Sequence, residues 1–134
     1  MADGRVYVAG NFDSVNGVKR PGLARLLNDG ALDLSFAPTN LPNDFAVLVI
    51  QADGKIVGTK GGSVNGVTRP LLRLNLDGSK DENFSPTWQS WLPSTLFQSG
   101  VEQIGGKLLL YNWTLIPDGN DGTLIRLNPD GSLD

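Results

Sequence analysis

The chain has 134 residues with a formal net charge of −3, and it is 40% hydrophobic and 19% charged. This composition is too apolar for a disordered chain. No apolar run reaches the roughly 20 residues of a membrane-spanning helix, so we expect no membrane insertion. The negative net charge does not favour contact with a phosphate backbone, so we expect no nucleic-acid binding. The absence of cysteine and histidine excludes disulfides, Ser-His triads and the commonest zinc ligands.

One pattern occurs three times along the chain. The copies span residues 2–51, 52–103 and 104–134, and the third is the shortest. The stretch SVNGV appears at Ser14–Val18 and again at Ser63–Val67. Matches of this length at matching positions are typical of a structural repeat, and a repeat of about 50 residues predicts a propeller or a related array.

Turn residues separate short apolar segments in every copy. In chain order, a Gly-containing pair predicts a hairpin, an Asn-Gly pair predicts a second turn in the first two copies, an Arg-containing strand follows, and an Asp-Gly turn comes after it. The first hairpin pairs are Asp3-Gly4, Asp53-Gly54 and Gly105-Gly106. Further short segments lie near Leu32–Phe36 and Glu82–Phe84. This order predicts four short strands per copy, and the frequent glycine and proline argue against helices.

We therefore predict an all-β fold with a single domain over residues 1–134. The expected architecture consists of β-propeller-type blades of four short antiparallel strands, about three blades in the chain, with the last one incomplete. Each blade needs a neighbour to bury its apolar face. A β-sandwich or a β-solenoid is the structural alternative, although solenoid coils usually have shorter periods.

The repeated segments resemble the delta-60 repeat family, a bacterial and phage-associated β-propeller-type repeat. In copy two the matching residues are Gln51–Gly58, Ser63–Gly66, Arg69, Leu72–Asp81 and Phe84, and in copy one Asp3–Gly10, Phe12, Ser14–Gly17, Ala24–Leu26, Gly30–Asp33 and Phe36. Copy three departs from the pattern at Trp113–Asp121. The resemblance implies a propeller fold, often within large surface or secreted proteins, and it implies no shared catalytic residues.

The first copy begins at the second strand of a blade, and the third stops at Asp134, before the expected phenylalanine. Three blades are fewer than the about four to eight of a closed propeller. We therefore expect completion by other copies or by another chain, either as a six-bladed C2 ring of two copies or as a head-to-tail filament. The edges expected to pair are Arg5–Ala9 and Leu124–Asp134. The alternative is a fragment of a longer repeat protein, whose neighbouring blades would complete it.

Residues that recur in each copy are expected to be structural, because every blade offers them the same environment. The recurring charged residues are Arg25, Arg73 and Arg126 with Asp33, Asp81 and Asp134, which we expect to pair within or between blades. The oxygen-rich segments Asn75–Asp81, Asn128–Asp134 and Asp29–Asp33 loosely resemble calcium loops. They lack the spacing and the bidentate glutamate of an EF-hand, so Asx turns are the preferred interpretation and no metal is expected.

Residues outside the repeat are the better candidates for a ligand or interface. They are Trp88, Trp91 and Trp113, together with Asp118, Asn120 and Asp121 in an Asp-Gly-rich segment expected to be a loop tip. Exposed tryptophan stacks on sugar rings or anchors protein interfaces. The alternative is that these side chains fill space between blades.

Catalysis is not indicated. Only two glutamates occur, Glu82 and Glu102, and most aspartates fall in turn motifs. There is no GK[ST] phosphate loop, so we expect no enzyme activity and no cofactor. The expected function is a self-associating structural or adhesive component of a surface appendage, fibre or phage-like particle. The rival is a module that binds a glycan or a surface receptor through its Trp-rich segment.

Overall fold

A computed structural model describes residues 4–41, 45–59, 71–86, 97–116 and 119–134 of the chain. For residues 112–121 and 123, it describes at most the backbone. The described residues form ten strands in small antiparallel sheets, which confirms the prediction of an all-β fold. No helix long and apolar enough to span a membrane occurs in this part of the chain.

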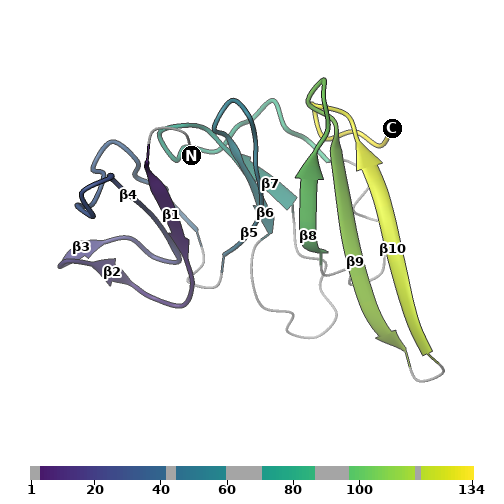
Figure 1. Ribbon diagram of the computed structural model, residues 1–134, viewed down its shortest axis with the longest axis horizontal. Helices are drawn as coiled ribbons and strands as arrows, with labels where there is room; N and C mark the ends of the chain where they lie inside the picture. Colours follow the sequence, from purple (N-terminus) through teal and green to yellow (C-terminus); the bar gives the residue numbers. More distant parts are fainter. Residues whose placement is uncertain (1–3, 42–44, 60–70, 87–96, 117–118) are drawn as a thin grey trace.

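Three sheets stand side by side in chain order and act as three blades (Figure 1). Blade 1 pairs β1 (Val6–Ala9) with β4 (Leu23–Leu26) and carries the hairpin of β2 (Ser14–Val15) and β3 (Val18–Lys19). Blade 2 contains β5 (Ala46–Ile50), β6 (Ile56–Thr59) and β7 (Leu71–Leu74). Blade 3 contains β8 (Phe97–Glu102), β9 (Leu108–Ile116) and β10 (Gly119–Leu127).

Asp53-Gly54 and Gly105-Gly106 form two of the predicted hairpins, and Asp3 of the third pair lies outside the described residues. Between β5 and β6, the Gly54 N–H donates to the Gln51 carbonyl at 2.8 Å, and the Asp53 carboxylate accepts from the Lys55 N–H at 3.0 Å. Gly54 has a φ of 84°, the left-handed conformation that closes a three-residue hairpin loop. The chain reverses here because Gly accepts this backbone angle without strain.

Sheets and sequence copies are offset by one strand. β5 belongs to the end of the first copy, yet it pairs with β6 of the second. β8 likewise comes from the end of the second copy and pairs with β9 of the third. The first and second copies therefore each supply a strand to the blade of the next copy, which links neighbouring copies covalently and through a β-ladder.

The last of the four predicted strands is reduced to one bridge per blade. Leu26 bridges Leu32, Leu74 bridges Lys80, and Leu127 bridges Leu133. The ladder stops because the chain turns at once: the Phe84 N–H donates to the Asp81 carbonyl at 3.2 Å, and the Asp81 carboxylate accepts from the Asn83 N–H at 3.0 Å. The described sheets thus have two or three regular strands each.

The described part of the expected loop tip in copy three, from Gly119 on, is a strand instead. Gly119–Leu127 pairs with Leu108–Ile116 in one continuous antiparallel ladder. Asn120 and Asp121 face Leu115 and Thr114 in this register. The turn-forming composition of the segment is overridden because nine consecutive residues on each side can pair. This hairpin takes the place that β2 and β3 occupy in blade 1.

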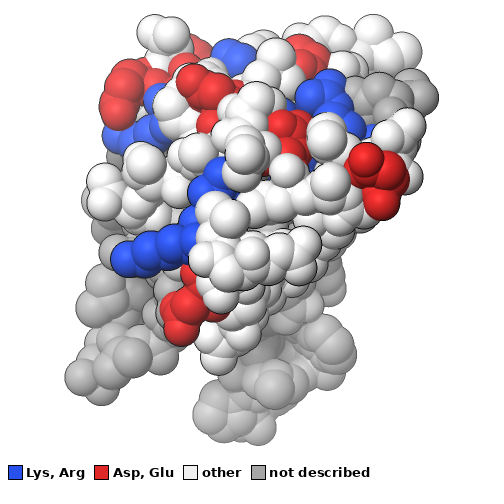
Figure 2. Space-filling model, turned by 90° about the vertical axis from the view of Figure 1, so that its left-hand side faces the viewer, with Lys and Arg blue, Asp and Glu red and all other residues white. Residues whose placement is uncertain are grey.

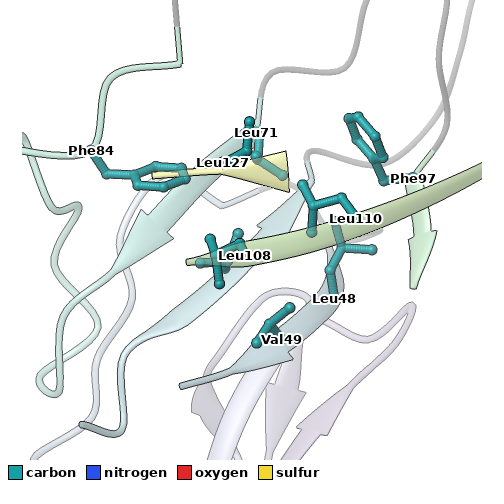
Figure 3. Close-up of a cluster of buried hydrophobic side chains, with 9 residues drawn as sticks. Leu48, Val49, Leu71, Phe84, Phe97, Leu108, Leu110 and Leu127 are labelled. Atoms are coloured by element: carbon teal, nitrogen blue, oxygen red, sulfur yellow. The ribbon is translucent and has the colours of Figure 1, made fainter. Parts of the chain in front are cut away.

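Two apolar clusters lie between the blades. We call the face of a blade toward the next blade in the chain its forward face, and the opposite one its rear face. The cluster between blades 1 and 2 contains Leu23, Phe36, Leu41, Phe45, Ile56 and Leu74. The cluster between blades 2 and 3 contains Leu48, Val49, Val57, Leu71, Phe84, Phe97, Leu108, Leu110 and Leu127 (Figure 3). Side chains alternate between faces along each strand, so blade 2 packs one face against blade 1 and the other against blade 3.

Candidate functional site

Each blade carries an ion pair between its last strand and the residue eight positions further on. The three pairs are Arg25–Asp33, Arg73–Asp81 and Arg126–Asp134. In the first two, Nε and Oδ2 lie 2.8 Å apart. The aspartate N–H also donates to the arginine carbonyl in all three, so backbone and side chain join the same two positions. That these residues serve structure rather than ligand binding stays a prediction.

The guanidinium groups of the first two arginines also lie over aromatic rings. Arg25 Cζ is 4.9 Å from the centroid of Phe36, and Arg73 Cζ is 4.7 Å from that of Phe84. Both phenylalanines are buried between blades. A cation placed over a desolvated ring is attracted by the ring quadrupole, which helps to hold the guanidinium in the interface.

The same arginines reach the next blade. Arg25 Nη1 donates to the carbonyl of Leu76, 51 residues on, at 2.7 Å. Arg73 Nη1 donates to the carbonyl of Pro129, 56 residues on, at 2.6 Å. Each acceptor is the residue just before the Asp-Gly turn of the following blade. One arginine therefore binds its own aspartate, a ring and the backbone of its neighbour.

A backbone hydrogen bond accompanies each of these contacts. The Ala37 N–H donates to the Asp77 carbonyl at 2.8 Å, and the Ser85 N–H donates to the Asp130 carbonyl at 2.9 Å. The donors follow the stacked phenylalanine in each copy. The two inter-blade contacts are thus built from equivalent atoms, and they define one repeated way of docking a forward face on a rear face.

The outermost faces carry the same residue types without a neighbour among the described residues. The Arg126 side chain is 50% exposed, whereas those of Arg25 and Arg73 are 3% and 9% exposed. On the forward face of blade 3, Leu124 is 61% exposed, although its equivalents Leu23 and Leu71 are buried. Tyr111 on the adjacent strand is exposed as well.

The rear face of blade 1 is exposed in the same manner. Val6 is 55% exposed, whereas its equivalents Ile56 and Leu108 are fully buried. Val8 is exposed beside it. On this side of the molecule, acidic and basic side chains are interspersed and leave uncharged surface between them (Figure 2). The chain therefore presents two different apolar faces at opposite ends of the row of blades.

The carboxyl group of Asp81 has a strongly lowered pKa. Burial opposes its ionisation, but hydrogen bonds from Lys55, from the Asn83 N–H and from Arg73 outweigh burial and lower the pKa of Asp81 to about 2. Hydrogen bonds from the hydroxyl and N–H of Ser35 lower the pKa of Asp33. These aspartates stay ionised near neutral pH, which keeps the ion pairs intact.

We expect the free energy of unfolding to fall as the pH is lowered from about 5 to 2. The pKa of Asp81 is below its ordinary value of 3.8, so its contribution is complete above that value and is lost as the pH drops toward the folded-state pKa. The shift corresponds to roughly 2 kcal/mol. Denaturant titrations across this range measure the loss. Asp81→Asn should show a shallower pH dependence, and an unchanged slope in that variant would contradict the assignment.

Two surface hollows lie around the segment Thr39–Leu41. One of about 560 Å³ is also lined by Asp13, Lys19 and Arg20, and one of about 420 Å³ extends to Lys80 and Glu82. Each mixes charges of both signs, so neither favours one class of ligand. Among the described residues, no group of three or more carboxylates is arranged to hold a metal ion.

The non-repeated candidates are not brought together in the described part of the chain. Trp88, Trp91 and Asp118 lie outside the described residues. Trp113 is a backbone position of β9, and Asn120 and Asp121 are positions of β10, with their side chains not described. Their roles as ligand or interface residues stay predictions.

The Asp77 turn is held by local hydrogen bonds, and Glu102 is held by hydrogen bonds to a distant turn. Asp77 Oδ1 accepts from the N–H and hydroxyl of Ser79 at 2.9 and 2.7 Å, which is an Asx-type turn and which lowers the pKa of Asp77. Glu102 Oε1 accepts from Gln51 Nε2 at 2.9 Å, and its Oε2 accepts from the Ala52 N–H at 2.6 Å. Glu102 therefore ties the β5–β6 turn to blade 3.

Sequence reasoning missed the carbonyl acceptors and the exposed apolar residues. Leu76 and Pro129 carry no signal in their side chains, because their function here is performed by the backbone. Val6 and Leu124 have ordinary strand composition, and only the row of blades shows that they lie on its outer faces. The repeat alignment could have found the acceptors, since both precede an Asp-Gly pair.

Antiparallel blades that dock face to face through one repeated set of contacts define a β-propeller repeat protein. The chain matches the family described as a domain of unknown function (DUF5122) beta-propeller over residues 2–36, 51–84 and 113–134, and it belongs to that family. These segments include all three Arg–Asp pairs. Comparison with curated proteins and with solved structures gave no match.

Proposed function

We propose that this chain is a non-enzymatic propeller module of the delta-60 type that associates with further copies of itself. In this role it serves as a structural or adhesive component of a surface appendage, fibre or phage-like particle. The observation that carries the proposal is the exposure of Leu124 and Val6 at the two ends of the row of blades, at positions that are buried in the internal interfaces. Exposed apolar faces of this kind mark protein interaction sites.

The edge of blade 1 supports the same proposal. In the described residues, β6 and β9 each pair on both sides, whereas β1 pairs with β4 alone. An unpaired strand edge presents free N–H and carbonyl groups that template association. β1 covers most of the edge Arg5–Ala9 expected from the sequence.

The carboxyl groups support a non-enzymatic role. A carboxylic acid that acts as a general acid near neutral pH needs a raised pKa. Among the described residues, every resolved shift of a carboxyl pKa is downward, as in Asp81 and Asp33. Glu82 pairs with Lys80 at 2.7 Å, and Glu102 binds the turn described above. The rival function in glycan or receptor binding has no supporting observation in the described residues.

We expect light scattering on a dilution series of the purified chain to give a native mass above that of the 14.3 kDa monomer. Burial of the exposed apolar faces drives association, so the mass should fall on dilution. A stable dimer would fit a six-bladed ring, and a mass that grows with concentration would fit a filament. A folded monomer at every concentration would contradict self-association.

A further inference from the structure

We infer that the forward face of blade 3 binds the rear face of blade 1 of a second copy, with Arg126 donating a hydrogen bond to the main-chain carbonyl of Asn28 of the partner subunit. This inference rests on the proposed self-association and specifies its geometry. The contact reproduces between two chains the arginine–carbonyl bond and the apolar contacts of the docking that occurs twice within one chain.

The donor is in place. Arg126 occupies the position of Arg25 and Arg73 on the last strand of its blade, and it makes the same ion pair with the aspartate eight residues on. In the other two arginines, Nη1 donates a hydrogen bond to a carbonyl of the next blade. Arg126 is half exposed, so its guanidinium is available for the equivalent bond.

The acceptor lies in the matching turn of blade 1. Asn28 precedes an Asp-Gly pair, as Leu76 and Pro129 do. The turn has the same backbone hydrogen bond in each blade: the glycine N–H donates to the carbonyl three residues earlier, at 3.0 Å in blade 1 and 2.9 Å in blades 2 and 3. Asn28 is exposed on this turn. The carbonyl of Asn28 is therefore carried by a turn of the same geometry as those that the internal arginines bind.

The apolar surfaces around this bond match as well. Leu124 occupies the forward-face position at which Leu23 and Leu71 are buried by a following blade. Val6 occupies the rear-face position at which Ile56 and Leu108 are buried by a preceding blade. Bringing the two faces together would bury both, as the internal interfaces do.

The two faces differ, so the contact is heterologous. A contact between two forward faces would place one Arg126 against another and offer neither guanidinium a turn carbonyl. Two like charges brought together in an interface are unfavourable. A head-to-tail contact gives each arginine an acceptor, and it closes into a ring or continues as a filament according to the rotation between copies.

The test uses two single-face variants. Leu124→Glu disables the forward face, and Val6→Glu disables the rear face. Both side chains are exposed, so each variant should fold, which circular dichroism and thermal unfolding check. We expect each variant alone to have the monomer mass. An equimolar mixture should form a dimer and nothing larger, because the intact forward face of the Val6→Glu chain can bind the intact rear face of the Leu124→Glu chain.

The arginine is tested in the same mixture. Arg126→Met placed in the Val6→Glu chain should weaken the mixed dimer roughly tenfold to a hundredfold, as expected for a lost hydrogen bond to a charged group. Lys80→Met, which removes an exposed cation elsewhere on the surface, is the matched control and should leave the affinity unchanged. An unchanged affinity with Arg126→Met would overturn the assigned hydrogen bond.

The remaining outcomes separate this inference from the function on which it rests. Suppose that the unsubstituted chain associates. If the Val6→Glu variant then also associates by itself, or if the mixture of variants stays monomeric, the head-to-tail contact is wrong and self-association stands. If the unsubstituted chain is monomeric throughout, self-association itself is wrong. Should Val6→Glu fail to fold, Val8→Glu on the same exposed face replaces it.

Discussion

Replacing Arg73 by methionine is expected to lower the free energy of unfolding by roughly 3 kcal/mol, because Arg73 is the buried partner of both Asp81 and the Pro129 carbonyl. Methionine retains much of the apolar stem but leaves the carbonyl without its donor. Lys55 Nζ lies 2.8 Å from Asp81 Oδ2, so Asp81 keeps one charged partner in the variant. The decrease in the free energy of unfolding should therefore be at the lower end of the range for a broken buried ion pair. Urea denaturation followed by circular dichroism measures the change.

Arg126→Met is the matched control for that experiment. Arg126 pairs with Asp134 in the same way, but its side chain is 50% exposed, so its loss should cost less than about 1 kcal/mol. The comparison is made at a dilution at which the chain is monomeric. Similar decreases in the free energy of unfolding of the two variants would show that the hydrogen bond from Arg73 to the Pro129 carbonyl contributes little, contrary to expectation.

Substituting Gly78 by alanine is expected to be much more damaging than the same change at Gly30. Both residues have left-handed backbone angles, with φ of 89° and 84°, so each substitution carries a similar strain of about 1 kcal/mol. At Gly78, the added Cβ would lie 2.6 Å from Pro38 N and 3.0 Å from Ala37 C in the preceding blade. At Gly30, it would meet nothing within 4 Å.

The clash at Gly78 involves backbone atoms, which cannot move without separating the blades. We therefore expect Gly78→Ala to cost roughly 1–3 kcal/mol more than Gly30→Ala. Thermal unfolding of the two variants and of the unsubstituted chain measures the difference. Equal effects would mean that the strained turn alone limits stability, and that blades 1 and 2 are less closely docked than the structure describes.

Local features of the fold were predictable from the sequence because they depend on neighbouring residues. Asp53-Gly54 closes a hairpin through contacts within five residues, and Asn16-Gly17 joins β2 to β3. The ion pair of Arg25 with Asp33 was also expected, since both positions recur together. These contacts are short in sequence, so composition and spacing are sufficient to suggest them.

Other features depended on pairing that local composition does not specify. The segment 119–122 has a turn-forming composition, but it continues β10 because β9 offers it a complete ladder. The segments that begin near Leu32 and near Asp81 were expected to be strands, but each blade makes one bridge there, at Leu32 and at Lys80, and the chain then turns. In the first case the ladder with β9 outweighs turn formation, and in the second the local hydrogen bonds to Asp33 and Asp81 outweigh further strand pairing.

The sequence by itself determined the repeat, the turns and the recurrence of one arginine in each copy. Only the tertiary structure decided which of these equivalent residues are buried. Arg73 and Arg126 have similar neighbours in the chain, yet one is enclosed by blade 3 and the other faces outward. Gly78 and Gly30 close the same turn, yet only Gly78 has a blade against it. The physical reason is that burial depends on the neighbouring blade, and a residue's position in the row of blades determines whether it has one.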